Sequence, residues 1–219
     1  MKSSGFKLDG DTTLVCCALL SEAQPLIQAL ELRQYETRPY KLFRKPGSNV
    51  VLLISGVGGA TLRKALDWLR VQVRVQRAVL VGTAASLDPG IEAGTAFCAA
   101  EVDRKLTSGF CSSEAVRLPA AGLGSGLLPG VRLVSLEKPY IKDPAVLPQS
   151  TLVDMEAWHF VQYWREFLDT EDIAVIKIVS DQGCDRIPSR EETRHIMELQ
   201  LERWLAMLRQ LAVEVQDNS

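Results

Sequence analysis

The chain has 219 residues, a formal charge of −2 and a pI near 5.8, and 47% of its residues are hydrophobic. This content supports a substantial core and excludes wholesale disorder, while the weakly acidic balance carries no signature of nucleic-acid binding. The longest apolar run, residues 14–20, is too short to span a membrane, and the polar N-terminus lacks a signal-peptide core. We therefore expect a cytoplasmic protein without nucleic-acid or membrane partners.

Buried strands alternate with helices along the chain, because continuous apolar runs typical of parallel strands are separated by helical patterns. Two capping boxes, Ser21 with Gln24 and Ser189 with Glu192, mark helix starts. The pattern predicts strands over 14–20, 50–54, 78–81, 95–100, 131–135 and 173–179, and helices over 21–32, around 65–69, over 156–167 and over 189–215. This order predicts one α/β domain over 1–219, with a largely parallel sheet, a loop-rich stretch at 107–130 and flexible ends at 1–12 and 216–219.

The five cysteines include no C-x-x-C pair. Cys16 and Cys17 are adjacent in a predicted strand, so they should point to opposite faces as small core residues. With only two histidines and no clustered Cys/His spacing, neither a disulfide framework nor a zinc site is expected, and we expect no cofactor.

Polar and glycine-rich residues follow five of the apolar segments. They are Ser21-Glu22, SGVGG (55–59), GTAAS (82–86), Asp154-Met155-Glu156 and Ser180-Asp181. Ligands of open α/β sheets bind beyond the carboxyl ends of strands, so these groups predict a binding site at one edge of the sheet.

Each feature also has an ordinary structural explanation. Glycines after a strand make tight turns, although the same backbone can cradle an anion at a helix start. Glu22 complements a helix dipole, Asp154 can cap the helix after it, and Asp181 can cap a turn. His159 shares a helix face with Glu156 and is expected to pack rather than to catalyse.

Taken together, the segments resemble the nucleoside phosphorylase and nucleosidase superfamily, and especially the methylthioadenosine/S-adenosylhomocysteine nucleosidases. The resemblance lies in LVCCALLSEAQPLIQAL, LLISGVGGATLRKAL, AVLVGTAASLDPGIEAGT, TLVDMEAWHFVQ and VIKIVSDQGCDR, which occur in the family's order. It implies a three-layer α/β/α fold with a central, mostly parallel mixed sheet.

The resemblance also implies roles for individual residues. Asp181 would protonate or hydrogen-bond the leaving purine with the help of Ser180, and Glu22 would position or activate water. The substrate-binding residues would be Glu156 at the ribose hydroxyls, Met155 against the sugar, Thr83, Ser55 and Gly56 on the water or phosphate side, and Tyr140 stacking on the base. An ordinary surface role for Tyr140 is equally compatible with the sequence.

This chemistry is reasonable independently of the family. Cleavage of an N-ribosyl bond develops a cationic sugar and an electron-rich base, so one group must donate a proton while another carboxylate activates the nucleophile on the opposite face. We therefore expect hydrolysis of a purine nucleoside, with adenine as the base, for example methylthioadenosine.

Several departures keep alternatives open. GTAAS replaces two glycines of the family pattern, and 104–149 is shorter than in the family. Leu80 and Val81 stand where phosphorylases often carry an arginine, and Arg63 lies on a solvated helix face, which favours water over phosphate. The alternatives are a phosphorylase, a nucleosidase for a bulkier adenosyl compound, and a catalytically silent nucleoside-binding relative. The resemblance further implies a homodimer or larger homo-oligomer.

Overall fold

A computed structural model describes residues 8–104, 115–119, 129–138, 151–183 and 186–199, together with 201–203, 205, 206 and 208. Its strands are β1 (Leu8–Cys17), β2 (Arg33–Glu36), β3 (Lys41–Arg44), β4 (Val50–Ile54), β5 (Val73–Ser86), β6 (Ala96–Arg104), β7 (Val116–Arg117), β8 (Gly130–Ser135), β9 (Thr151–Asp154) and β10 (Ile173–Asp181). Its helices are α1 (Leu20–Ala29), α2 (Gly59–Arg70), α3 (Ala157–Trp164) and α4 (Arg190–Glu198), with a 3-10 turn at Thr170–Asp172. None of the helices in these described stretches is long and apolar enough to cross a membrane.

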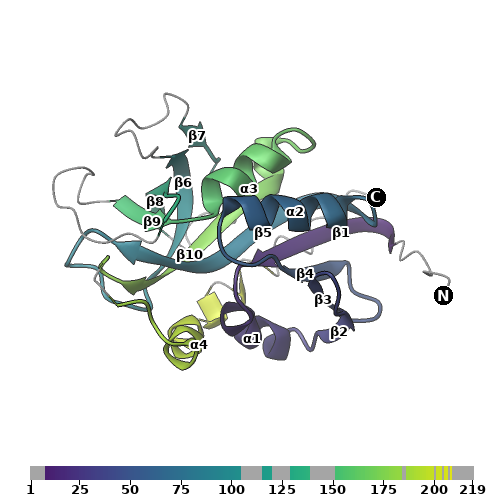
Figure 1. Ribbon diagram of the computed structural model, residues 1–219, viewed down its shortest axis with the longest axis horizontal. Helices are drawn as coiled ribbons and strands as arrows, with labels where there is room; N and C mark the ends of the chain where they lie inside the picture. Colours follow the sequence, from purple (N-terminus) through teal and green to yellow (C-terminus); the bar gives the residue numbers. More distant parts are fainter. Residues whose placement is uncertain are drawn as a thin grey trace.

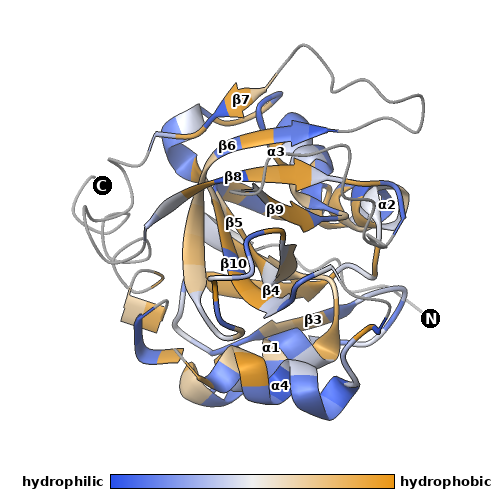
Figure 2. Cartoon of the chain, turned by 90° about the vertical axis from the view of Figure 1, so that its left-hand side faces the viewer, coloured by the Kyte–Doolittle hydropathy of each residue, from blue (hydrophilic) through white to orange (hydrophobic). Residues whose placement is uncertain are grey.

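The strands form one mixed sheet whose centre is parallel. β4, β1, β5 and β10 lie side by side in parallel, so their carboxyl ends meet at one edge. β10 pairs with β6 as well as β5, and this second pairing closes β5, β10, β6, β8 and β9 into a ring. These strands gather at the end of the molecule that faces the viewer in Figure 2. The mixed α/β architecture expected from the sequence is confirmed.

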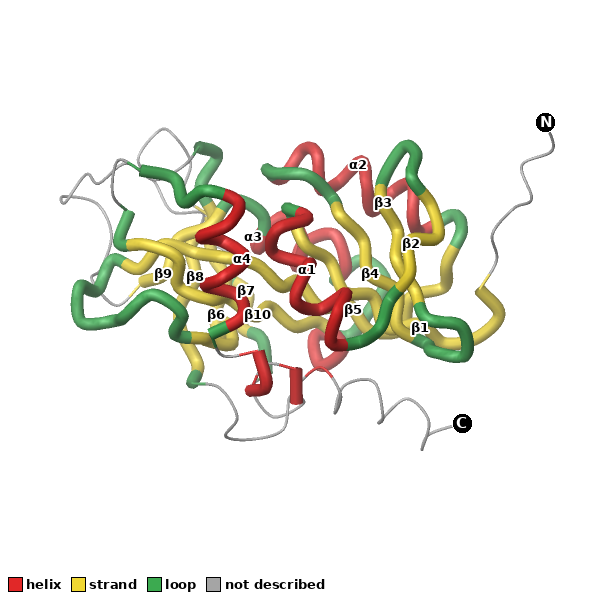
Figure 3. The backbone as a smooth tube through the Cα atoms, turned by 90° about the horizontal axis from the view of Figure 1, so that it is seen from below, coloured by secondary structure: helices red, strands yellow, loops and turns green. Residues whose placement is uncertain are grey.

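Helices cover both faces of the sheet, as Figure 1 shows, with α2 and α3 on one face and α1 and α4 on the other. Seen from below, α1 and α4 run next to each other across the strands (Figure 3). Each face has its own core of buried residues. Cys16 belongs to the α2–α3 core and Cys17 to the α1–α4 core, and both are free thiols, so the prediction of opposite-facing core cysteines is confirmed.

The first strand and helix differ from the sequence prediction at their junction. The strand begins at Leu8, inside the stretch expected to be flexible, and it ends at Cys17 rather than Leu20. The predicted capping box of Ser21 with Gln24 is wrong, because α1 begins at Leu20 and the Glu22 carboxylate accepts a hydrogen bond from the N–H of Leu19. The early start places Glu22, not Gln24, in the first turn.

Other elements also differ in length or were not predicted. The antiparallel strands β2 and β3 have no clear apolar alternation, and β2 is largely exposed at the sheet edge. Residues 82–86 continue β5, and α4 stops at Glu198 instead of running unbroken to residue 215. The capping box that starts α4 is confirmed, because Ser189 and Glu192 exchange both hydrogen bonds.

Candidate active site

Glu22 is buried where β1 passes into α1, with 4% of its surface exposed. One carboxylate oxygen accepts from Leu19, and the other accepts from both the N–H and the hydroxyl of Thr83 on β5, at 2.8 and 2.9 Å. A carboxylate offers about four acceptor positions, so these three bonds leave room for one more donor. A glutamate that only complemented the helix dipole at the surface would not form hydrogen bonds with a neighbouring strand.

Gly82 allows the close approach of Glu22 to β5. A Cβ atom at position 82 would lie 3.0 Å from the Glu22 Oε1 atom. The two replaced positions of GTAAS need no glycine, because residues 82–86 are extended strand, and Glu31 is the only non-glycine residue with positive φ in the described part of the chain. The departure from the family pattern therefore introduces no backbone strain.

Glu156 closes over the glycine turn that follows β4. Its carboxylate accepts a hydrogen bond of 2.6 Å from the N–H of Gly58, the residue that precedes α2. Gly56 and Gly58 both have positive φ, at 84° and 90°, which side-chain-bearing residues rarely adopt. Within the turn, the N–H of Gly58 therefore binds the protein's own Glu156, while the N–H groups of Ser55 and Gly56 bind backbone carbonyls.

Asp154 links β9 to its neighbours and to α3. It accepts hydrogen bonds from the hydroxyl of Ser135 and from the N–H of Ala157, the first residue of α3. The helix-capping interpretation of Asp154 is therefore confirmed. Its Oδ2 atom also lies 2.8 Å from the amine of Lys177 on β10.

Lys177 is a buried charged residue of the candidate site that the sequence analysis missed. It is 2% exposed, and its amine contacts Asp154 and, at 3.5 Å, the carbonyl of Thr83. It faces the α2–α3 core between Val175 and Val179, within an otherwise apolar strand. A charged amine is costly to bury without partners, and this cost is the signal that could have identified it.

Lys177 contacts one buried carboxylate, Asp154, and the charges of two more, Glu156 and Glu22, also act on it. Burial opposes its charged form, but Asp154, Glu156 and Glu22 outweigh that cost and raise the pKa of Lys177. Burial also raises the pKa of Glu156 to about 7; Lys177 acts against this rise, and Asp154 and Glu22 add to it. We call these four residues, Glu22, Asp154, Glu156 and Lys177, the acidic cluster.

Ser180 and Asp181 lie further along β10, beside the end of β5. The Ser180 hydroxyl is 2.7 Å from Asp181 Oδ2 and 3.3 Å from the carbonyl of Ala84, the residue after the Thr83 partner of Glu22. Asp181 Oδ1 accepts a hydrogen bond from Gly183, so the turn-capping interpretation of Asp181 is confirmed. The pair is half-buried.

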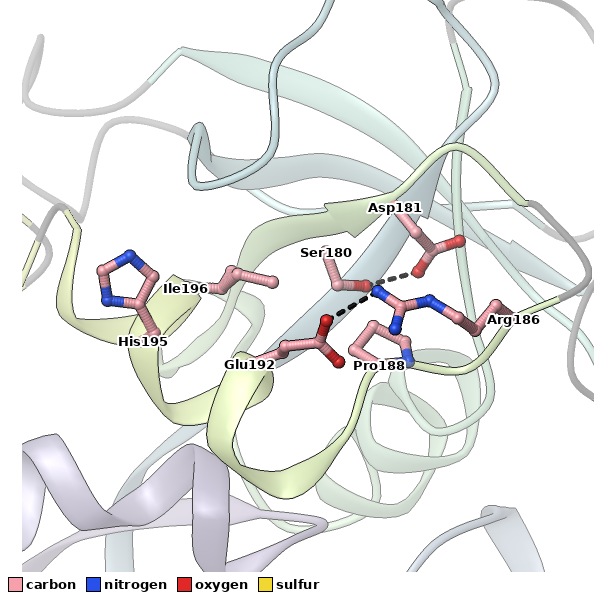
Figure 4. A pocket seen from close by; sticks show the side chains of 7 residues that line it. All are labelled: Ser180, Asp181, Arg186, Pro188, Glu192, His195 and Ile196. Carbon is pink, nitrogen blue, oxygen red and sulfur yellow. Dashed lines mark hydrogen bonds and ion pairs between the residues drawn. The ribbon is translucent and has the colours of Figure 1, made fainter.

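A pocket of about 230 Å³ opens between Asp181 and α4. Its walls come from the end of β10, the segment after it and one face of α4 (Figure 4). Arg186 crosses this space and forms an ion pair of 2.6 Å with Glu192 on α4. None of the four residues of the acidic cluster lines the pocket. Asp181 therefore lies between β5, which carries the Thr83 partner of Glu22, and the open pocket.

The remaining predicted site residues occupy different positions. Ser55 is 1% exposed and directs its hydroxyl to backbone carbonyls, one of them that of Gly56. Met155 is half-buried between the two acids of its motif. Tyr140 lies outside the described residues. His159 packs against Gly59, where a Cβ atom would come within 1.9 Å of its ring, and burial lowers its pKa, in agreement with a packing role.

No protein-family model and no curated protein sequence matches the chain. Solved structures do. The methylthioadenosine nucleosidase of Helicobacter pylori, in a mutant with 5′-methylthioadenosine in the active site, has a TM-score of 0.72 at 13% identity, covering 92% of this chain and 99% of that one. The fold is that of these nucleosidases.

Two further structures give the same result. The methylthioadenosine/S-adenosylhomocysteine nucleosidase of Colwellia psychrerythraea, in complex with adenine, has a TM-score of 0.72 at 21% identity over 94% of this chain and 97% of that one. A futalosine hydrolase mutant of Helicobacter pylori has a TM-score of 0.72 at 12% identity, covering 91% of this chain and 99% of that one. The nucleoside phosphorylase-like fold expected from the sequence is thus confirmed.

Proposed function

We propose that the protein hydrolyses the N-ribosyl bond of a purine nucleoside and releases the free base. The observation that carries this proposal is the acidic cluster, which places three buried carboxylates around one lysine beside Asp181, in a fold shared with nucleosidases. The nucleoside would be the small-molecule partner and water the co-substrate. Adenine is the base expected from the resemblance.

Asp181 is the proposed proton donor to the leaving base. It stands at the end of β10, half-buried, and Ser180 contacts one of its oxygens. Gly183 holds the other oxygen, so the carboxyl group has a fixed orientation. Protonation or a strong hydrogen bond at the base neutralises the negative charge that would develop there as the bond breaks.

The acidic cluster is proposed to bind the sugar and the attacking water. Excess negative charge around Lys177 favours a cationic, oxocarbenium-like sugar. Glu156, held by Gly58, would accept hydrogen bonds from the ribose hydroxyls, with Met155 against the sugar. Glu22 keeps one acceptor position for the attacking water, while Thr83 and Leu19 fix its carboxylate.

Water is preferred over phosphate as the nucleophile. Phosphate sites usually use guanidinium groups, and the candidate Arg63 points away: its side chain is 64% exposed and lies 4.0 Å from Glu166. Lys177 supplies a single charge that Asp154 already engages. A homodimer or larger assembly and a cytoplasmic location stay predictions.

The test is base release by the purified protein. We expect free base from at least one of methylthioadenosine, adenosine, inosine and S-adenosylhomocysteine in phosphate-free buffer, with no rate increase when phosphate is added. Base release that depends strictly on phosphate would show that the protein is a phosphorylase and not a hydrolase. Binding of a nucleoside without release of base would identify a silent relative instead.

A further inference from the structure

The pocket beside Asp181 has an unusual balance of hydrogen-bonding groups. Arg186 brings five N–H donors, of which one is spent on Glu192. Both oxygens of Glu192 have partners, since Oε1 accepts from Arg186 and Oε2 accepts from the N–H of Ser189 at 2.8 Å. Both oxygens of Asp181 are likewise engaged, by Ser180 and Gly183. Each of these two carboxylates keeps about two acceptor positions, while the free side-chain donors of the pocket are mainly the four remaining N–H groups of Arg186.

Glu192 keeps this guanidinium in place. The hydrogen bond from Ser189, followed by that from Arg186, lowers the pKa of Glu192 to about 2, so it is a carboxylate at any physiological pH. Because Glu192 belongs to the capping box of α4, its position is fixed by the start of that helix. Figure 4 shows Arg186 reaching across between Asp181 and Glu192, while His195 lies at the far end of the pocket.

The pocket suits a base rather than a whole nucleoside. Its volume of about 230 Å³ is below the roughly 300–1,000 Å³ of pockets for drug-sized ligands. Pro188 and Ile196 give it apolar walls for a flat ring. Asp181, the proposed proton donor, is one of the residues that line the pocket, so a base bound here would lie next to it.

We propose that Arg186 determines the base specificity of the enzyme and selects a 6-oxopurine over adenine. This inference rests on the proposed function and revises its base. A guanidinium donates to the O6 acceptor of a 6-oxopurine and leaves N7 to Asp181, whereas the 6-amino group of adenine presents donors to donors.

The experiment compares matched substrate pairs that differ only in the base: inosine with adenosine, and 5′-methylthioinosine with 5′-methylthioadenosine. We expect kcat/KM of the wild-type chain to favour the 6-oxo member at least about tenfold in each pair. Arg186→Met should reduce this ratio by roughly 10- to 100-fold, almost entirely through the 6-oxo member. Arg190→Met, which removes an exposed arginine of α4 outside the pocket lining, should leave the ratio unchanged.

A calorimetric titration with the free bases separates this inference from the proposed function. Hypoxanthine should bind the full chain at least about tenfold more tightly than adenine, and Arg186→Met should remove the difference. Tight hypoxanthine binding without base release would uphold the base specificity and refute the hydrolase. Base release with adenine preferred, or a ratio that Arg186→Met does not alter, would overturn the role of Arg186 and leave the hydrolase standing.

Discussion

The two sides of Asp181 are built differently. In the acidic cluster the contacting side chains of Lys177 and Asp154 are 3% and 1% exposed, and β10, β9 and β5 all contribute contacts. In the pocket the corresponding ion pair, Arg186 with Glu192, is 76% and 40% exposed and joins a short connection to one helix. The buried side is fixed by partners on several strands, while the open side is held by one surface ion pair.

In the proposed function, this difference separates the residues of the reaction from those that recognise the base. The buried charges are expensive unless each one keeps its partners, so the cluster tolerates little change and suits chemistry common to all substrates. A solvent-exposed ion pair contributes little to stability, so residues around it can change without unfolding the protein. Substrate preference is therefore expected to vary at the pocket and the reaction to depend on the cluster.

Lys177→Met should have the largest effect. It leaves Asp154 and its neighbours without their cation, and loss of one partner from a buried pair costs about 3–5 kcal/mol. Chemical denaturation of the two proteins measures the change. Lys64→Met on the exposed face of α2 is the matched control and should stay within about 0.5 kcal/mol. Equal losses in the two variants would mean that Lys177 is not held as a buried ion.

Glu156→Gln should change how stability depends on pH. Because burial raises the pKa of Glu156 to about 7 from its ordinary value of 4.5, the folded protein binds the extra proton between these values. Stability from this group is complete below pH 4.5 and is lost as the pH rises through 7.

The glutamine variant lacks this loss. Its free energy of unfolding relative to the wild type should rise by about 3 kcal/mol between pH 4.5 and pH 8, at about 1.4 kcal/mol per pKa unit. Denaturation curves of both proteins across this range provide the measurement. A constant difference would show that Glu156 titrates as an ordinary exposed carboxylate.

Gly59→Ala tests the packing at the base of the cluster. An added methyl group would meet the His159 ring at 1.9 Å, so overpacking should cost about 1–3 kcal/mol, although alanine is otherwise the better helix former. The double variant with His159→Ala should recover most of that loss in thermal unfolding. If the double variant did not recover stability, the loss in Gly59→Ala would not come from contact with the His159 ring.

Arg186→Met should have the smallest effect on stability. Removal of this exposed partner of Glu192 should shift the unfolding midpoint by no more than about 2 °C, because an exposed ion pair contributes little. A shift as large as that of Lys177→Met would erase the distinction between the two sides of Asp181.

The sequence predicts most of the residues to which the proposed function assigns the reaction. Asp154, Glu156, Ser180 and Asp181 follow apolar segments, and their position at strand ends is enough to bring them to one sheet edge. Lys177 was missed because a single lysine in an apolar run carries no motif of its own. Its partners lie on other strands, and only the folded sheet brings them together.

The pocket and the ring closure were not predictable in the same way. Arg186 looks like an ordinary surface charge in the sequence and Glu192 like a helix cap, and only the place where α4 begins brings them next to Asp181. The second pairing of β10, with β6, depends on contacts between segments about 80 residues apart, which local patterns do not encode. The short strands β2 and β3 lack the alternation by which strands are recognised.

The most direct test of the account is base release by Asp181→Asn. The asparagine keeps the shape and can still accept from Ser180 or Gly183, but it cannot donate an acidic proton. We expect base release to fall by about 10²- to 10⁴-fold while the unfolding midpoint stays close to that of the wild type. A variant that folds normally and keeps nearly full activity would contradict the assignment of Asp181 as the group between the acidic cluster and the base.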